Sequence, residues 1–478
     1  MAFKDLRAFI KLLEERGQLK RITAEVSAEL EIAEIADRVV KRGDGPALLF
    51  ENVSGHDMPV LINAFASEQR MAWALGVERL DQAAEKIRHL VQLAPPSGFV
   101  GKLRALGDLR EVAAAAPRTI EHGPCQEVDA ETSFGQLPIL KCWPQDGGRY
   151  ITFPMVVTRD PATGRRNVGL YRIQIYGERE AGMHWHRHKG GAEHGQHKKA
   201  GRLEAAIAIG ADPATVYSAS APLPPAVDEF VFAGFLRGQG VELVKCKSVD
   251  LEVPAHAEIV LEGFVDLDDQ RLEGPFGDHT GYYSLPDYYP TFHLTRVTHR
   301  RAPIYLTTIV GRPPMEDFWL GKATERLFLP MMQMIAPEIA DVNMPAEGVF
   351  HNLVIVSIAK RYPGQPQKVM YALWGMGQMM LARNIVVVDD HVDVQDLSEV
   401  AWRVTANVDA RRDLVVVDGP VDVLDHAAPR PLLGGKLGID ATAKTALDGY
   451  EREWPPDIIM SDEIRELVDR RWQEYGFS

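Results

Sequence analysis

The sequence is poor in cysteine, in basic charge and in long apolar runs, and each shortage excludes a class of protein. Only three of the 478 residues are cysteine, and Cys125, Cys142 and Cys246 have no CxxC spacing. They predict a reducing compartment and exclude a thiolate metal site. Lys and Arg number 53 against 67 Asp and Glu, a net charge of −14, which argues against a nucleic-acid partner. No run of 18 apolar residues and no signal-peptide pattern occurs, so we expect a soluble, cytoplasmic protein without a membrane span.

What the sequence does contain is the composition of an ordinary globular protein, with 46% hydrophobic and 25% charged residues. At about 150 residues per domain, two or three domains are expected. We predict a mixed α/β fold in three parts. These are an N-terminal α/β domain over residues 1–115, a central and mainly antiparallel sheet or barrel over 116–322, and a C-terminal α/β domain over 323–478.

Hydrophobic periodicity supports this division. The middle part has strands separated by Gly, Pro and Asp turns, whereas the last part alternates helices with continuous apolar strands, which predicts a parallel sheet covered on both faces. The terminal helix is amphipathic and should pack on another element or another subunit. The predicted helices are 3–13, 30–40, 68–93, 227–236, 324–334, 369–383, 398–408 and 462–475. The predicted strands are 47–50, 60–62, 167–176, 183–188, 204–209, 241–245, 258–264, 291–298, 304–309, 353–358, 385–388 and 414–417.

The first candidate site is a row of histidines. On the predicted strand that carries them, His184, His186 and His188 project to one face. Three neutral imidazoles on one face could bind Zn, Mn or Fe. A polar strand whose histidines form hydrogen bonds or meet solvent is an equally good interpretation. We interpret His194 and His197, which follow, as loop residues rather than ligands.

Two further segments carry groups suited to an active site. Asn167 could offer a carbonyl oxygen to a hard cation, and Arg172 could make a two-point contact with phosphate or carboxylate. Residues 273–283, with the sequence EGPFGDHTGYY, place Glu273 and Asp278 on either side of a Gly-Pro turn. Carboxylates near each other and an arginine can differ in pKa, one ionised and one carrying a proton. The plain interpretation of residues 167–172 is an exposed strand, and that of residues 273–283 is a solvated turn.

The last candidate is the glycine-rich segment 433–440, LGGKLGID. It is not a Walker loop, because the spacing and the Ser or Thr after the lysine are missing. It predicts either a glycine loop that presents Lys436 to a phosphate or an ordinary turn, and the local pattern favours the turn.

Taken together, these segments resemble the UbiD family of reversible decarboxylases, which use prenylated flavin mononucleotide (prenylated FMN). The match runs in order along nearly the whole chain, and several motifs in one order are far more specific than any one of them. The matching segments are 4–9 (KDLRAF), 45–52 (GPALLFEN), 124–126 (PCQ), 137–139 (LPI), 142–144 (CWP), 209–214 (IGADPA), 250–255 (DLEVPA), 273–283 and 311–314 (GRPP).

The resemblance implies a central split β-barrel, similar to flavin reductases, that holds prenylated FMN with Mn²⁺ and K⁺. A flavin prenyltransferase would supply the cofactor. The implied catalytic residues are Arg172, Glu273 and Asp278. The implied metal ligands are Asn167, His188 and Glu229. The implied cofactor-binding residues are Asn167, Leu170, Tyr171, Arg172, His184, Trp185, His186, Lys189, Gly190, Glu229 and Lys436.

One departure from the family pattern concerns the substrate. The ubiquinone-pathway branch typically has Arg-Trp-Leu where this chain has His184-Trp185-His186, and Arg where it has Lys189. The cofactor site should survive this change, but the substrate need not be a polyprenyl hydroxybenzoate. We expect residues 315–319, together with Leu432 and Leu433, to set the substrate choice.

The expected activity is the reversible, non-oxidative decarboxylation of an aromatic or α,β-unsaturated carboxylic acid by a homo-oligomer, either a dimer or a hexamer. Glu273 beside Arg172 should stay ionised, and Asp278, expected to be the drier of the two, should hold the proton for the substrate carbon. Two alternatives are a metal-dependent hydrolase that uses the strand histidines and a non-catalytic subunit of a multi-subunit carboxylase. Retention of all three catalytic residues weighs against the second.

Overall fold

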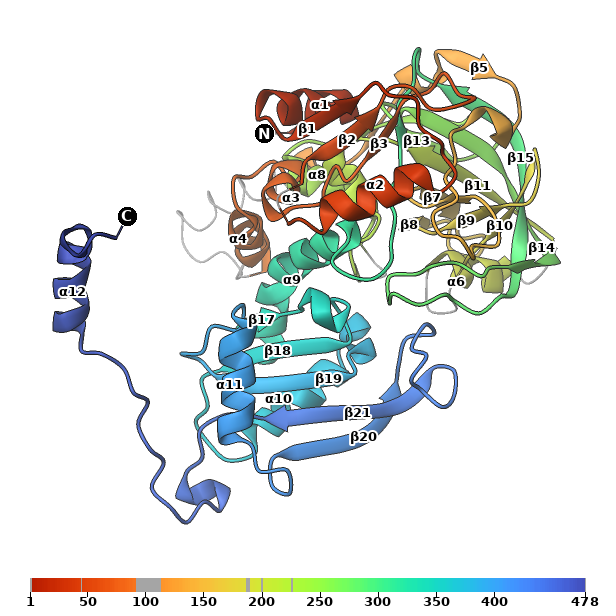
Figure 1. Cartoon of the computed structure of the whole chain (residues 1–478). Helices are drawn as coiled ribbons and strands as arrows, with labels where there is room; N and C mark the ends of the chain where they lie inside the picture. Colours follow the sequence, from red (N-terminus) through yellow and green to blue (C-terminus); the bar gives the residue numbers. More distant parts are fainter. Residues whose placement is uncertain are drawn as a thin grey trace, which may run out of the picture.

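The computed structural model arranges the chain around four β-sheets flanked by helices (Figure 1). It describes residues 2–43, 45–91, 113–185, 190–198, 201–224 and 227–477. Helices and strands mix throughout, which confirms the predicted α/β fold class. Within these ranges, no helix is both long and apolar enough to span a membrane.

The N-terminal sheet has the order β1–β2–β3–β16 and contains both parallel and antiparallel pairs. Helix α1 buries Leu6, Phe9, Ile10 and Leu13, the apolar face that the sequence predicts. The strand expected over 304–309 is only two residues long and belongs to this sheet instead of the central one. The elements are α1 (Leu6–Glu15), β1 (Leu19–Ile22), α2 (Glu31–Val40), β2 (Ala47–Phe50), β3 (Val60–Ile62), α3 (Glu68–Ala74), α4 (Leu80–Val91) and β16 (Tyr305–Leu306).

The central sheet is curled and antiparallel, as predicted, with the order β6–β9–β10–β15–β14–β11–β7–β8 and β5 paired to β15. Its two longest strands, β14 and β15, form a hairpin, and residues 273–283 lie where the chain passes from one strand to the other. We call these residues the acidic turn. The strands are β5 (Val128–Ala130), β6 (Tyr150–Ile151), β7 (Met155–Arg159), β8 (Arg166–Leu170), β9 (Ile173–Ile175), β10 (Glu180–Met183), β11 (Arg202–Ile209), β14 (Ile259–Glu273) and β15 (Asp287–His299).

A smaller sheet and short helices surround this central sheet. One hydrophobic core joins the central sheet to the N-terminal one, and its aromatic rings include Phe9, Phe65 and Phe153. The helix α6 was not predicted, and it carries His194 and His197, so their assignment to a loop is wrong. The elements are η1 (Pro124–Gln126), η2 (Phe134–Gln136), α6 (Gly190–Lys198), α7 (Pro213–Ser218), α8 (Glu229–Arg237) and the sheet of β4 (Arg118–Ile120), β12 (Glu242–Lys245) and β13 (Glu252–Pro254).

The C-terminal sheet has the order β17–β18–β19–β21–β20. Strands β18, β19 and β21 are parallel and have apolar cores on both faces, as predicted, whereas β17 and β20 run antiparallel at the edges. The long helix α9 leads into this sheet and begins eight residues before the helix expected from 324. The elements are α9 (Glu316–Ile335), β17 (Ile339–Asn343), η3 (Ala346–Gly348), β18 (Leu353–Ile358), α10 (Gln365–Trp374), η4 (Gly377–Leu381), β19 (Asn384–Asp389), α11 (Leu397–Asn407), β20 (Leu414–Pro420) and β21 (Leu433–Asp440).

Two predictions for this region are wrong. The segment 414–417 was expected to be a buried strand, but β20 is an edge strand in which exposed and half-buried residues alternate. The glycine-rich segment 433–440 is not a turn, because it forms β21 in the middle of the sheet. Its glycines allow close packing: a Cβ on Gly438 would lie 2.4 Å from Met370 Sδ of α10.

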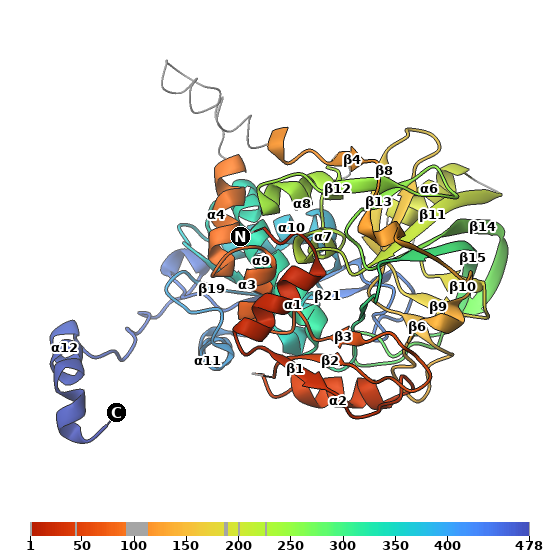
Figure 2. The same cartoon turned by 90° about the horizontal axis from the view of Figure 1, so that it is seen from above.

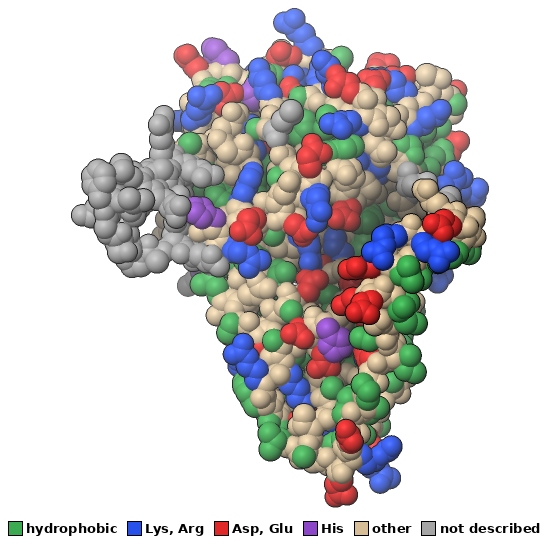
Figure 3. All heavy atoms as spheres, turned by 90° about the vertical axis from the view of Figure 1, so that its left-hand side faces the viewer, with side chains coloured by type: hydrophobic (Ala, Val, Ile, Leu, Met, Phe, Trp, Pro, Cys, Tyr) green, Lys and Arg blue, Asp and Glu red, His purple; other side chains and the backbone are tan. Residues whose placement is uncertain are grey.

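The chain ends in a segment that stands away from the rest of the molecule in both views (Figures 1 and 2). Asp457 anchors it, because Arg403 donates to both carboxylate oxygens, at 3.0 and 2.5 Å. The helix η5 (Ala446–Asp448) lies before that point, and α12 (Asp462–Arg471) and η6 (Trp472–Tyr475) lie after it. Neither α12 nor η6 buries a residue. Packing of this helix on another element of the chain is therefore wrong, and packing on another subunit, the other expected arrangement, stays a prediction. On the face seen in Figure 3, basic and acidic side chains are interspersed.

Candidate active site

A break between two strands places Arg172 in the site. The sequence predicts one strand over 167–176, but β8 ends at Leu170 and β9 begins at Ile173. Tyr171 and Arg172 lie between the two strands, and the Arg172 side chain is only 8% exposed. The strict alternation of a strand is lost here, and both residues contribute to the site.

Glu273, the last residue of β14, is fully buried and accepts hydrogen bonds from two side chains. Arg172 donates from Nε to Oε1 at 2.8 Å and from Nη2 to Oε2 at 3.0 Å, and His184 Nδ1 lies 3.0 Å from Oε2. Burial alone would raise the pKa of Glu273, but these hydrogen bonds and the guanidinium charge outweigh it and lower the pKa to about 2. Glu273 is therefore ionised, as expected.

His184 reaches Glu273 because β10 ends at Met183, just before it. The predicted strand over 183–188 is therefore wrong at His184 and Trp185, and residues 186–188 lie outside the described residues. The ring is buried and lies against Tyr289, with 4.2 Å between centroids. Burial and the nearby guanidinium lower the pKa of His184, so a neutral imidazole faces the carboxylate and donates from Nδ1. Three predicted site residues of this segment lie outside the described residues: His186, His188 and Lys189.

Asp278 lies across the acidic turn from Glu273 and shares the same guanidinium. Arg172 Nη1 donates to Oδ2, while the backbone N and the Nδ1 of His279 lie 2.7 and 2.8 Å from Oδ1. Burial opposes the charge, but Arg172 and His279 outweigh it and hold the pKa of Asp278 well below its usual range. Asp278 is 6% exposed and Glu273 is 0% exposed. Both carboxylates are buried, so burial does not separate them, and the expectation that Asp278 keeps a proton at rest is wrong.

The loop 142–147 holds the acidic turn from behind. Asp146 is buried and accepts from the backbone N–H groups of Cys142, Trp143 and Gly277, at 3.2, 2.8 and 2.8 Å. A Cβ on Gly277 would lie 2.2 Å from the Trp143 ring, and Gly274 has a φ of +99°, which favours glycine. Two sequence-distant segments therefore fix the positions of both carboxylates.

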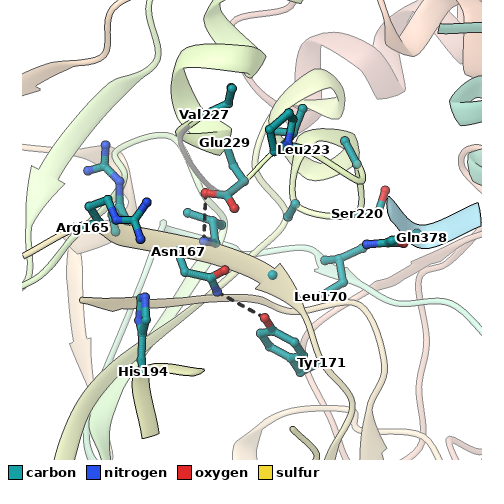
Figure 4. A pocket seen from close by; sticks show the side chains of 16 residues that line it. Arg165, Asn167, Leu170, Tyr171, His194, Ser220, Leu223, Val227, Glu229 and Gln378 are labelled. Carbon is teal, nitrogen blue, oxygen red and sulfur yellow. Dashed lines mark hydrogen bonds between the residues drawn. The ribbon is translucent and has the colours of Figure 1, made fainter. Parts of the chain in front are cut away.

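A polar cavity of ≈ 300 Å³ lies on the other side of the strand break (Figure 4). Its wall joins β8, the start of α8 and the short helix η4 of the C-terminal part, which contributes Gln378. His194 of α6 also lines it, with Nδ1 2.9 Å from Thr158 Oγ1. The full lining is Arg165, Arg166, Asn167, Val168, Gly169, Leu170, Tyr171, His194, Ala219, Ser220, Ala221, Leu223, Pro224, Val227, Glu229 and Gln378.

Four predicted cofactor or metal residues share this cavity, and their chemistry fits a hard cation and a phosphate. Asn167 donates a hydrogen bond from its amide Nδ2 to Tyr171 Oη at 3.2 Å, and Glu229 Oε2 accepts one from Val168 N at 3.2 Å (Figure 4). Burial raises the pKa of Glu229 to about 7, which marks a carboxylate short of positive charge. Oxygen ligands of this kind suit Mn²⁺ and Mg²⁺. Leu170 completes the set.

Other predicted cofactor residues lie elsewhere. Lys436 is buried in β21, and its Nζ donates to the carbonyls of Met380 and Ala382, at 2.6 and 2.7 Å. It thereby supports the end of η4, whose Gln378 lines the cavity. Trp185 is buried beside His184, and Gly190 begins α6.

Sequence reasoning missed three contributors. It gave no role to His279, although its place next to Asp278 was a usable signal. It named His184 as a candidate metal histidine and a cofactor contact, but not as a partner of Glu273. Asp146 could not be found, because nothing in the segment 142–147 shows that it packs under a turn 130 residues away.

Comparisons with known proteins identify the family. Three family models match consecutive parts of the chain: the 3-octaprenyl-4-hydroxybenzoate carboxy-lyase N-terminal domain over residues 10–90, its Rift-related domain over 118–313 and its C-terminal domain over 318–441. An uncharacterised protein of Archaeoglobus fulgidus is 54% identical, with 99% of each chain covered. One of Aquifex aeolicus is 50% identical, again over 99% of both chains.

Solved structures extend the likeness to enzymes. The UbiD-class enzyme HmfF from Pelotomaculum thermopropionicum, in complex with FMN, is 29% identical, with 97% of this chain and 99% of that one covered and a TM-score of 0.81. Vanillic acid decarboxylase of Sedimentibacter hydroxybenzoicus, in a closed form, is 28% identical, with 99% of each chain covered and a TM-score of 0.85. The chain described here belongs to the UbiD family, as its motifs predict.

Proposed function

We propose that this protein is a UbiD-type carboxy-lyase that decarboxylates an aromatic or α,β-unsaturated carboxylic acid, reversibly and without net oxidation, using prenylated FMN and Mn²⁺. The observation that carries the proposal is the buried contact of one guanidinium with two carboxylates beside a polar cavity. Arg172 bonds both Glu273 and Asp278, and the residue before it lines that cavity. Relatives with FMN or prenylated FMN support the cofactor class.

Side chains alone offer no adequate electron sink when carbon dioxide leaves an sp² carbon, and a bound modified flavin would supply that chemistry. The residues of this chain do the rest. Arg172 orients the two carboxylates and Glu273 keeps the guanidinium and His184 in place. As the C–C bond to the carboxylate breaks and carbon dioxide leaves, Asp278 delivers one proton to the same carbon. Because Asp278 is ionised at rest, it must first receive that proton.

The cavity residues would hold the cofactor. Asn167 and Glu229 are proposed as metal ligands, with His188 as the third, and the metal would anchor the flavin phosphate. Leu170 and Tyr171 would line the flavin. The other proposed contacts are His184, Trp185, His186, Lys189, Gly190 and Lys436. K⁺ is proposed without an assigned site.

Two other readings are weaker. A hydrolase built on the strand histidines needs them in a row on one strand face, but β10 ends at Met183, before His184. A non-catalytic subunit has no need for three buried charged residues held in one contact. We also propose a homo-oligomer, a dimer or a hexamer, because the protruding terminal segment exposes Ile458, Ile459 and Met460.

The test is co-expression with a flavin prenyltransferase, followed by absorbance and mass analysis of bound flavin. The loaded protein is then offered a panel of aromatic and α,β-unsaturated acids, and carbon dioxide release and deuterium exchange into the products are measured. We expect prenylated FMN, Mn²⁺ and turnover of at least one acid, with Arg172→Ala as the inactive control. A protein that retains metal but no flavin under these conditions would rule the proposal out.

A further inference from the structure

A pair of histidines joins the acidic turn to the C-terminal sheet. The Nε2 atoms of His279 and His351 lie 2.8 Å apart, and the ring centroids lie 5.1 Å apart. His351 comes from the segment just before β18, more than 70 residues along the chain. The other ring nitrogen of His279 lies 2.8 Å from Asp278 Oδ1. A continuous path of side-chain contacts therefore runs from the C-terminal sheet to Asp278.

The surroundings of His279 are acidic. Asp278 bonds it, Asp317 of α9 and Asp422 act on it through their charge, and Phe350 covers its ring at 5.6 Å between centroids. Asp317 Oδ2 is buried and has no hydrogen-bond partner among the described residues. The cation on the far side of Asp278 is Arg172. Burial opposes the charged imidazole, but the contact with Asp278 outweighs it and raises the pKa of His279.

Hydrogen-bond chemistry limits how protons are arranged in this pair. A nitrogen that faces a carboxylate must donate, so His279 carries a proton on Nδ1. Two facing ring nitrogens must share one proton between them, because neither two lone pairs nor two N–H groups can meet at 2.8 Å. When His279 also carries the shared proton, it is a cation that donates to both Asp278 and His351. The charges of Asp278 and Asp422 favour that arrangement. Asp317 adds to them where it is ionised, because burial raises its pKa to about 7.

We propose that His279 stores the proton that Asp278 delivers, and that His351 is a positioning residue of the C-terminal domain that keeps His279 charged. This inference rests on the proposed function, because it supplies the proton that an ionised Asp278 lacks. Proton delivery is thereby tied to the docking of the C-terminal sheet on the acidic turn.

The transfer is a single proton step. The Nδ1–H bond of His279 breaks and an O–H bond forms on Asp278 Oδ1, so the ion pair becomes a neutral acid and a neutral imidazole. Asp278 then gives a proton to the substrate carbon as carbon dioxide leaves. One proton from water restores the cation on His279, which is the one proton that decarboxylation of a carboxylate consumes.

A second contact across the same boundary provides a matched control. The rings of Tyr282, in the acidic turn, and His426, between β20 and β21, lie 4.0 Å apart. His426→Ala removes a histidine ring between the same two parts of the molecule and leaves the path to Asp278 intact. His351→Gln offers a carbonyl oxygen that can accept from His279, whereas His351→Ala offers nothing.

The first measurement is the pH dependence of deuterium exchange into product by the flavin-loaded enzyme. Exchange needs a charged His279, so the rate falls as pH rises through its pKa. In His351→Ala, His279 loses its hydrogen-bond acceptor, so the pH at which the exchange rate falls should be lower by about one unit. At a pH above both pKa values, exchange should then drop about tenfold. His351→Gln and His426→Ala should keep the wild-type profile. A His351→Ala profile that matches wild type, or an equal shift in His426→Ala, overturns the inference.

The second measurement uses the flavin-free protein. In ¹⁵N-histidine-labelled protein, the Nδ1 and Nε2 resonances of His279, assigned with His279→Gln, should titrate above the ordinary histidine value and lower in His351→Ala. If the resonances of His279 titrate at the wild-type pH in His351→Ala, the proposed role of His351 is wrong. If wild-type protein loaded with flavin shows no exchange on any acid, the proposed function fails instead, and this titration still decides whether the pair exists.

Discussion

Arg172 and Glu273 meet in a two-point contact, Nε to Oε1 at 2.8 Å and Nη2 to Oε2 at 3.0 Å, although one lies between β8 and β9 and the other at the end of β14. The third guanidinium nitrogen bonds Asp278. A planar fork with five N–H donors suits two carboxylates at once, and a lysine cannot replace it. The structure therefore couples both acids to a single cation.

This coupling predicts how stability depends on pH. Glu273 has a pKa of about 2 in the folded protein against an ordinary value of 4.5, so its contribution to stability is present above about pH 4.5 and is lost as pH falls toward 2. Between pH 7 and pH 3, this one group should cost wild type about 2 kcal/mol. Glu273→Gln should be less stable at pH 7, because Arg172 loses its partner, but should lose less on acidification. Thermal melts at both pH values test this, and an equal loss in the two proteins would contradict it.

The buried carboxylate beneath the acidic turn predicts a large structural effect. Asp146→Ala leaves three buried N–H groups without their acceptor, and each such group costs about 1–3 kcal/mol. Stability to denaturant should fall by at least about 2 kcal/mol, and turnover should fall because Gly277 adjoins Asp278. The control is Asp250→Ala, whose carboxylate is 84% exposed and should change stability little. Equal effects in the two variants would remove Asp146 from its supporting role.

The sequence predicts the fold well where a segment has one clear hydrophobic periodicity. The four apolar residues of α1 recur at helical spacing and are buried, and β18 reads as a continuous apolar strand because helices cover both of its faces. The prediction fails at β21, because its glycines are typical of a loop although the segment forms a strand. There Gly438 is needed because α10 packs too closely for a side chain, and a single sequence does not show that approach.

In the candidate site, too, the sequence predicts some features and misses others. Arg172, Glu273 and Asp278 were found because their motifs match a family, and the structure brings them together. The charge state of Asp278 could not be found, because it depends on His279 turning its Nδ1 toward Oδ1 and on how deeply each carboxylate is buried. The supporting residues come from distant segments and are visible only in three dimensions.

The polar cavity predicts how metal and flavin depend on Glu229. Glu229→Ala removes the proposed carboxylate ligand, so the co-expressed protein should lose its Mn²⁺ and most of its flavin, since the metal would anchor the phosphate. Metal analysis and flavin absorbance measure both. The matched control is Glu242→Gln, which changes an acid that pairs with Arg118 and His256, neither of which lines the cavity, and should leave both contents unchanged. Wild-type metal content in Glu229→Ala would show that the ligand assignment is wrong.

Substrate choice is predicted to depend on the start of α9. Phe318 is partly buried and stacks edge-on against Trp319, with 4.9 Å between centroids, next to the Asp317 that acts on His279. Phe318→Ala should therefore change which acids are turned over and leave flavin content intact. The panel of acids, measured with equal amounts of bound flavin, tests this. An unchanged order of preference would place Phe318 in the structural core.

The last prediction concerns the proton itself. Asp278→Asn keeps the size of the side chain but cannot carry the proton, so the variant should fold, bind flavin and accept substrate. General acid catalysis contributes about 10²–10⁴-fold, and turnover and deuterium exchange should both fall by that factor. Glu273→Gln should also be damaging, but partly through the displaced guanidinium and impaired cofactor loading, so its flavin content should fall too. Exchange measured per bound flavin separates the two roles. If Asp278→Asn exchanges at nearly the wild-type rate while Glu273→Gln does not, Glu273 is the acid and Asp278 only holds Arg172 in place.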